Sequence, residues 1–188
     1  MGGQETLLLV ARHPRLLAGA AAFDSVTNLA LQYHNFDLLV CRGACRRIWA
    51  GTLGPYLQTL AADEVGGTPT SDPGAYRRRS PIDHAREIAF SRVPLQLWWS
   101  VADGIVRDQA EQTGELFWTI KRLNPAAPVA AFVGSWMHTH EMRADSRLTL
   151  ALAIFGLLPS KFLRVPHRLH YVPASRFSLL LEQRGFEP

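Results

Sequence analysis

The sequence predicts an α/β fold in which a short, mostly parallel sheet carries helices on both faces. Three apolar segments, residues 16–23, 93–100 and 127–136, have the pattern of buried strands. Helical patterns separate these segments, and that alternation is typical of a parallel sheet. Sheets usually contain about five or six strands. About three strands therefore indicate a partial α/β sheet.

The bulk composition is that of a globular domain and excludes several classes of protein. The 188 residues are 47% hydrophobic and 19% charged, enough for one domain with a sizeable core. The apolar run 148–159 is too short to span a bilayer, and Met1 to Gly3 do not resemble a signal peptide. We therefore expect a cytoplasmic protein with no membrane partner.

The charge pattern does not favour a nucleic-acid partner. The net charge is +4, with much of the excess in residues 77–79, in residues 42–47 and beyond Ser160. A nucleic-acid surface would interleave aromatic side chains with a basic stripe, so solvated faces explain the arginines better. Cys41 and Cys45 have no second cysteine pair with which to form a zinc site. We expect both to be reduced thiols.

The chain begins with a predicted helix over residues 3–13, which Pro14 ends. The first strand follows as a run of small apolar residues typical of a buried strand. Asp24 or Ser25 is then expected to cap a helix that reaches about Tyr33.

The middle of the chain is predicted to be helical around one loop. Residues 36–67 have a helical pattern, and residues 66–81 form a loop rich in Gly, Pro, Ser and Thr. A short helix is expected over residues 82–91. After the second strand, helices are expected over residues 108–123 and, beyond the third strand, over residues 144–157.

Two strand ends carry residues capable of chemistry. Asp103 follows strand 93–100, and His138 follows strand 127–136. Functional residues gather at the carboxyl ends of parallel strands, so these side chains would meet at one edge of the sheet. A buried carboxylate can orient an imidazole that acts as a general base. The alternative is an aspartate that caps the next helix and a histidine in a loop.

Several segments of the sequence also resemble those of a known family. The pieces "RRRSP" (77–81), "VPLQLWWS" (93–100) with Asp103 beyond it, and "LNPAAPV" (123–129) before a strand and a histidine occur in this order. They resemble the C-terminal half of the catalytic domain of prolyl oligopeptidases, within the α/β-hydrolases. The resemblance covers most of residues 1–158, and residues 159–188 form a basic extension outside it.

This resemblance implies a serine hydrolase that cleaves peptide, amide or ester bonds through a Ser-Asp-His triad and uses no cofactor. Asp103 would orient His138, with His140 as the second choice. The Gly-x-Ser-x-Gly motif of such enzymes does not occur in residues 1–188. Met1 would follow the missing serine, supply an oxyanion-hole amide and precede the closing Gly2. We therefore expect a chain that begins inside the motif and is inactive as given.

The resemblance also suggests where a small-molecule or peptide substrate would bind. The helical stretch 36–67 would be an insertion that lines the pocket, with Trp49 and Tyr56 as its candidates. Trp98 and Trp99 could also line it, but their place in a strand favours core packing.

Two other functions remain open at this point. His138 and His140 form a His-x-His pair at a strand end, as in some metal-dependent hydrolases, although the further ligands are missing. The chain could instead be a non-catalytic interaction module, since an exposed sheet edge can pair with another chain or with a second copy.

Overall fold

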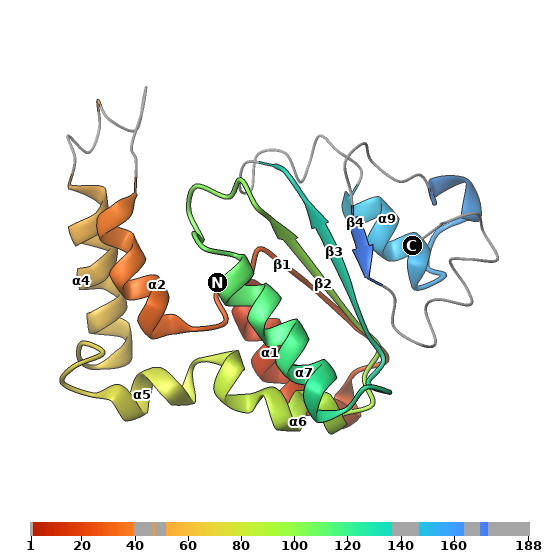
Figure 1. The fold of residues 1–188 in the computed structure, drawn as a ribbon, viewed down its shortest axis with the longest axis horizontal. Coiled ribbons are helices and arrows are strands. Elements are labelled where there is room, and N and C mark those ends of the chain that lie inside the picture. The colour runs from red at the N-terminus through yellow and green to blue at the C-terminus, as the bar shows by residue number, and fades with distance from the viewer. Residues whose placement is uncertain (1, 40–46, 48–51, 137–146, 164–169, 173–188) are drawn as a thin grey trace.

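A computed structural model of the chain shows one sheet with helices on two sides (Figure 1). The structure describes residues 2–39, 47, 52–136, 147–163 and 170–172.

The sheet has the strand order β1-β2-β3-β4. Strands β1 (Ala20–Phe23), β2 (Leu95–Ser100) and β3 (Val129–Gly134) run parallel, which confirms the predicted fold class. The fourth strand, β4 (His170–Val172), pairs antiparallel with β3. No strand was predicted there, because three residues within a basic tail give no alternating pattern of their own.

One face of the sheet is covered by α1 (Gly2–Arg12), α6 (Ala85–Phe90) and α7 (Glu115–Leu123). These helices bury apolar side chains against every second position of the strands, as the pleat requires. The core on this face includes Leu7, Ile88, Leu95, Leu97, Trp99, Leu116, Phe117 and Ile120.

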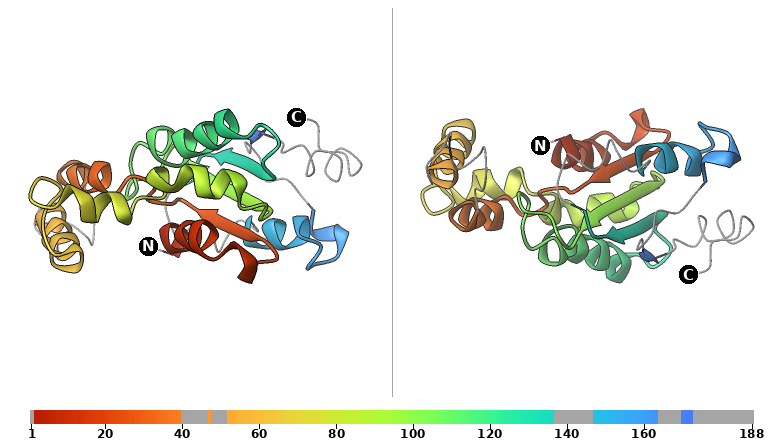
Figure 2. Two further views of the ribbon diagram at one scale, coloured as in Figure 1. Left: turned by 90° about the horizontal axis from the view of Figure 1, so that it is seen from below. Right: turned by 90° about the horizontal axis from the view of Figure 1, so that it is seen from above.

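The other face packs against α9 (Arg147–Ile154), which Figure 2 shows on the opposite side of the strands from α1, α6 and α7. Three aromatic rings cross the strands here: Trp98 stacks on Phe132 with centroids 4.1 Å apart and on Phe23 at 5.4 Å. Trp98 and Trp99 are both buried, so the tryptophans of β2 belong to the core.

The buried Gln96 also lies on this second face. Its Nε2 donates to the carbonyl of Ala151 at 3.1 Å, and its Oε1 accepts from Trp98 Nε1 at 3.0 Å. This amide therefore ties α9 to the sheet while both of its polar atoms have partners.

A second group of helices stands beside the sheet (Figure 1). It consists of α2 (Leu29–Asn35), the 3₁₀ turn Phe36–Leu38 and α4 (Leu53–Val65). The predicted helical stretch 36–67 is helical over these described parts. Two further 3₁₀ turns, Pro14–Leu16 and Ser160–Phe162, follow α1 and α9 respectively.

The cap predicted for the second helix was wrong. Asn28 caps α2 and accepts from the amide of Leu31 at 3.0 Å, whereas Asp24 and Ser25 are buried beside the sheet. Local spacing made any of these residues a possible cap, and the tertiary role of Asp24 decided between them.

The segment 66–81, predicted as a loop, contains the helix α5 (Pro73–Arg78). Asp72 caps this helix by accepting from the amide of Ala75 at 2.8 Å, and Pro73 provides the fixed φ that suits a first helical position. The loop-rich composition concealed a complete start signal for a short helix.

Three other predicted helices are shorter than expected or are divided into two segments. The helix expected over 82–91 is a 3₁₀ turn, Pro81–His84, followed by α6. The helix expected over 108–123 begins as a π-helix, Ala110–Gly114, before α7. The helix expected over 144–157 is described as α9.

Replacing Gly3 with alanine is expected to destabilise the fold by about 1–3 kcal/mol, because α1 lies too close to β1 for a side chain. A Cβ at Gly3 would lie 2.8 Å from the carbonyl oxygen of Phe23 and closer still to Ser25 Oγ. Urea unfolding measures the change.

Gly2→Ala is the matched control, since a Cβ at Gly2 meets no described atom within 4 Å. Equal stability of the two variants would contradict the proposed close approach.

Candidate active site

The carboxyl ends of β1, β2 and β3 are joined by one carboxylate. Asp24, directly after β1, is buried and has a left-handed backbone with φ of 42°. Its Oδ1 accepts from the amide of Ser100 at 2.9 Å, and its Oδ2 accepts from Trp136 Nε1 at 2.6 Å. One side chain thus connects the ends of all three parallel strands.

Ser100 and Trp136 reinforce this connection. The hydroxyl oxygen of Ser100 accepts from the amide of Trp136 at 2.7 Å, and the hydroxyl donates to the carbonyl of the same residue. The ring of Trp136 covers Gly134, where a Cβ would overlap it, and the guanidinium of the buried Arg147 lies 4.0 Å from the ring centroid. The ends of β2 and β3 are therefore held together just before the chain leaves the sheet.

Asp103 lies where the sequence places it, three residues beyond the end of β2. It is buried, with 8% of its surface exposed. Its Oδ1 accepts from the amides of Ile105 at 2.7 Å and Val106 at 3.0 Å. Both bonds hold the turn in one conformation. The alternative role, a cap on the following helix, does not fit these partners, because both amides lie before the helical segment that starts at Ala110.

The π-helix after Asp103 anchors the loop that follows β1. Oε1 of the buried Gln112 accepts from the amides of Thr27 at 2.9 Å and Asn28 at 2.7 Å. Thr113 Oγ1 donates to the carbonyl of Ser25 at 3.2 Å. These residues were not predicted to be functional, and the only signal for them was two adjacent polar side chains on the helix predicted over residues 108–123.

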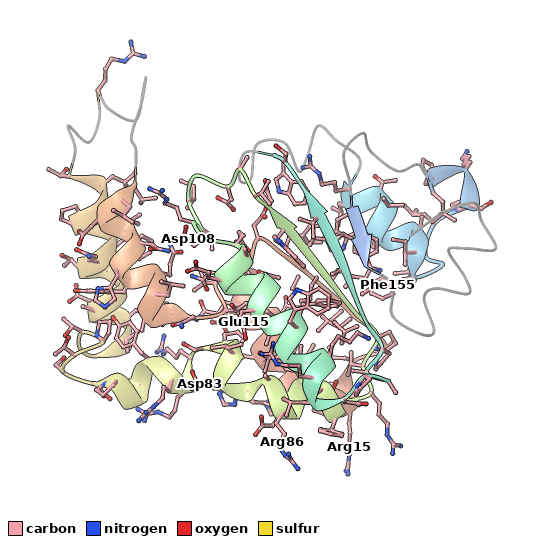
Figure 3. The ribbon with its side chains drawn as sticks, viewed as in Figure 1. Arg15, Asp83, Arg86, Asp108, Glu115 and Phe155 are labelled. Atoms are coloured by element: carbon pink, nitrogen blue, oxygen red, sulfur yellow. The ribbon has the colours of Figure 1, made fainter. Side chains whose placement is uncertain are left out.

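The same segment contacts α2 through Asp108, whose Oδ2 accepts from Asn35 Nδ2 at 3.0 Å (Figure 3). Asp108 also has a positive φ of 55°, at the point where the turn that holds Asp103 (the acid-bearing turn) leads into the π-helix Ala110–Gly114. A second contact to α2 comes from Tyr76 of α5, whose ring meets the edge of Tyr33. Burial, and secondarily the charge of Tyr33, raise the pKa of the Tyr76 hydroxyl.

The first turn of α1 also lies at the carboxyl ends of the strands. Gly3 lies against Phe23 and Ser25, at the end of β1 and just beyond it. The N-terminal end of α1 and the turn that holds Asp103 therefore both adjoin the strand ends joined by Asp24.

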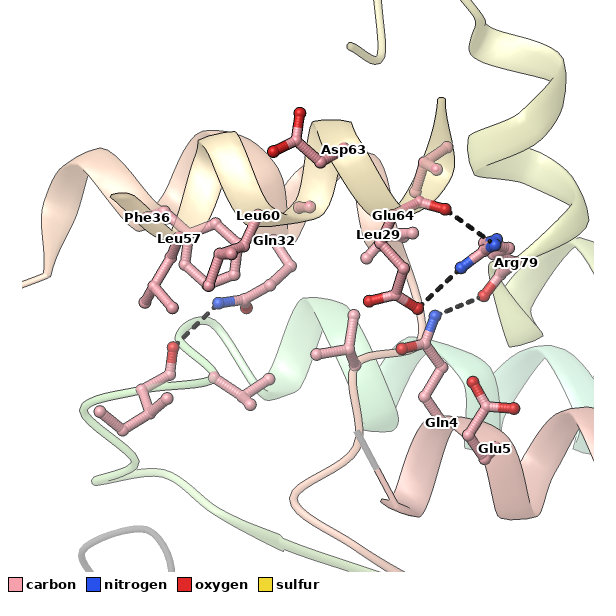
Figure 4. Close-up of a pocket in the computed structure, with 15 residues that line it drawn as sticks. Gln4, Glu5, Leu29, Gln32, Phe36, Leu57, Leu60, Asp63, Glu64 and Arg79 are labelled. Carbon is pink, nitrogen blue, oxygen red and sulfur yellow. Dashed lines mark hydrogen bonds and ion pairs between the residues drawn. The ribbon is translucent and has the colours of Figure 1, made fainter. Parts of the chain in front are cut away.

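A cavity of about 610 Å³ opens beside these two features (Figure 4). One wall includes Gln4 and Glu5 of α1, and another includes Ile105 and Val106, whose amides hold Asp103. Helices α2 and α4 and the 3₁₀ turn Phe36–Leu38 close the cavity with mainly apolar side chains. Among these are Leu29, Phe36, Leu57 and Leu60.

Polar contacts bridge the walls of this cavity. Gln4 Nε2 donates to the carbonyl of Arg79 at 2.6 Å, and Arg79 forms an ion pair with Glu64 of α4 at 2.8 Å. Gln32 Nε2 of α2 donates to the carbonyl of Ile105 at 2.9 Å. The helical group and the sheet-bound elements are thus connected directly across the cavity.

The remaining predicted site residues are placed only in part. Tyr56 lies on α4 with 44% of its surface exposed, and its neighbours Leu57 and Leu60 line the cavity. The other predicted residues fall outside the part of the chain that the structure describes. These are Met1, Trp49, His138, His140 and the cysteines Cys41 and Cys45.

Within the described ranges, no three His, Cys, Asp or Glu side chains are grouped as metal ligands would be. No helix in that same portion is long and apolar enough to cross a membrane.

Comparison with known proteins identifies the fold. No protein-family model matches the sequence, and no curated protein matches it. Among solved structures, the acylaminoacyl peptidase of Pyrococcus horikoshii matches 82% of this chain with a TM-score of 0.57 and 17% sequence identity. The fold is that of part of an α/β-hydrolase.

A puromycin hydrolase also matches, over 90% of the chain, with a TM-score of 0.48 and 17% identity. The chain spans 22% of the length of each of these two proteins. At 17% identity, the likeness to the acylaminoacyl peptidase establishes the fold alone.

Asp24→Asn is expected to destabilise this α/β-hydrolase fold by about 1–3 kcal/mol. The amide keeps the size of the side chain and tolerates positive φ, but its nitrogen cannot accept a hydrogen bond. Either Ser100 N or Trp136 Nε1 then loses its acceptor in a buried place. Chemical denaturation checks the change.

The matched control is Asp83→Asn, because Asp83 is exposed and remote from the strand ends. A loss of stability no greater than that of the control would contradict the role given to Asp24.

Proposed function

We propose that this chain is the C-terminal part of the catalytic domain of a serine hydrolase of the prolyl oligopeptidase type, which cleaves peptide, amide or ester bonds. Asp103 is the acid of the triad, and His138 is the base, with His140 as the second choice. The nucleophilic serine belongs to residues encoded ahead of Met1.

The cavity is the observation that carries this proposal. Its walls include both the first turn of α1, next to the expected nucleophile, and the two residues whose amides hold Asp103. A bound substrate would therefore lie between the nucleophile and the acid-bearing turn. Enzyme sites are commonly apolar cavities with a few polar groups, and about 610 Å³ is within their usual size.

The position of α1 supports a strand ahead of it. Helix α1 packs on β1, which forms one edge of the described sheet. A strand that precedes α1 and lies parallel to β1 would make the usual right-handed crossover. The serine at the end of that strand would then occupy the turn before Gly2, where α/β-hydrolases hold their nucleophile. The same edge offers an alternative pairing with a second copy of the chain.

In the proposed reaction the histidine takes the serine proton while the serine oxygen attacks the scissile carbonyl. Asp103 holds the imidazole in the required tautomer and stabilises its protonated form. The backbone amide of Met1, when it is part of a longer chain, donates to the developing oxyanion. The histidine then returns the proton to the leaving group, and water releases the acyl group by the same steps.

The 188-residue chain is expected not to react with a fluorophosphonate probe, because it holds no Gly-x-Ser-x-Gly motif. A chain extended by the in-frame codons upstream of Met1 is expected to react. In the extended chain, Asp103→Asn should slow labelling by about 10³- to 10⁴-fold, and His138→Ala by a similar factor.

Asp83→Asn in the extended chain is the control and should label at the parent rate. Two results would contradict the proposal. One is labelling of the short chain that His138→Ala abolishes, and the other is an upstream reading frame without a Gly-x-Ser sequence next to Met1.

A further inference from the structure

The side-chain hydrogen-bond donor groups that line the cavity are already bonded, whereas some acceptors are not. The side-chain donor groups of three wall residues each have at least one acceptor already: Gln4 Nε2 donates to Arg79 O, and Gln32 Nε2 donates to Ile105 O. The two terminal nitrogens of Arg79 donate to Glu64, at 2.8 Å to Oε1 and at 3.0 Å to the backbone oxygen. A ligand that needs donors would therefore compete with existing bonds.

Acceptors, in contrast, are left over. Gln32 is 1% exposed, and its Oε1 has no hydrogen-bond partner within the described structure. Such a buried acceptor costs free energy until a donor reaches it. Glu64 uses only Oε1 for Arg79, and Figure 4 shows its carboxylate directed into the space between Gln4 and Leu29.

The charge of the walls has the same sign as these acceptors. Three carboxylates, Glu5, Asp63 and Glu64, line the cavity beside one guanidinium, that of Arg79. Glu64 neutralises Arg79, and the carboxylate of Glu5 forms no ion pair or hydrogen bond with any residue placed by the structure. Asp63 adds negative charge at the rim, although its carboxylate is turned outward in Figure 4. The cavity is therefore net negative.

The rest of the lining is apolar. Apolar side chains come from the loop after β1, from α2 and the 3₁₀ turn that follows it, from α4, and from the turn after Asp103. These are Val26, Leu29, Phe36, Leu57, Leu60 and Val106. Such walls favour a hydrocarbon or aromatic group of a ligand by removing it from water.

We propose that the cavity binds an apolar group bearing a protonated amine, which makes the substrate class of the enzyme an ester or amide with a cationic amine on one side of the scissile bond. This inference rests on the proposed function for its placement beside the reacting bond. An anionic group would face Glu5 and Glu64, and a neutral apolar group would leave the acceptor of Gln32 without a donor.

The test measures binding of three probes of similar size to the 188-residue chain by isothermal titration calorimetry at pH 7. The probes are 2-phenylethylamine, 2-phenylethanol and 3-phenylpropionate. We expect the amine to bind about fivefold or more tightly than the alcohol, since charge pairs near a protein surface contribute up to about 1 kcal/mol each. The carboxylate should bind more weakly than the alcohol.

The double variant Glu5→Gln and Glu64→Gln should remove the preference for the amine and leave binding of the alcohol within about twofold. Its matched control is Glu87→Gln, on the exposed side of α6 and away from the cavity. Circular dichroism verifies that each variant folds as the parent does. The preference for the amine should also decrease with added salt, because these carboxylates are partly solvated.

Equal affinity for amine and alcohol would overturn the inference, as would the failure of all three probes to bind at millimolar concentration. Neither result affects the fluorophosphonate test, which requires no amine. Labelling of the extended chain without any preference for cationic probes would therefore retain the hydrolase and reject the substrate class. Preference for the amine without labelling would do the opposite.

Discussion

The buried carboxylate of Asp24 is the interaction on which the candidate site depends. It accepts from the backbone of β2 and from the indole of Trp136, while its own backbone continues β1. Because the three strands are parallel, their carboxyl ends lie side by side, and one side chain can join all three ends. The turn that carries Asp103 begins from this fixed point, so its position follows from the position of Asp24.

The cavity depends on a second layer of contacts. Helices α2 and α4 stand beside the sheet, and Gln32, Glu64 and Arg79 connect them to the acid-bearing turn and to α1. The sheet provides the rigid part of the site, and the helical group provides the walls that would select a ligand. In the proposed enzyme, chemistry and selectivity would therefore come from different parts of the chain, as is usual when binding elements stand on a rigid scaffold.

Much of the fold could be predicted because its signals are local. Strand β3 is a continuous apolar run and β2 is mostly apolar, as is typical of strands buried on both faces, and Asp103 follows β2 after two residues. The errors occurred where one residue could serve two purposes. Asp24 has the spacing of a helix cap, but its side chain binds the end of β2 instead. Strand β4 was missed for another reason, because it forms by pairing with the edge of β3. The buried contacts of Gln32 and Gln112 were not predicted, since a polar residue within a helix is normally solvated.

The sequence by itself determined the fold class, the order of the parallel strands along the chain and the place of Asp103 beyond β2, because apolar periodicity and strand ends are properties of neighbouring residues. Only the tertiary structure decided that Gly3 must be a glycine, that Asp24 joins three strands, and that residues from α1, α2 and α4 enclose one cavity. Those features involve segments far apart in the chain. Their contacts exist only after burial of the core has brought the segments together, so no local pattern encodes them.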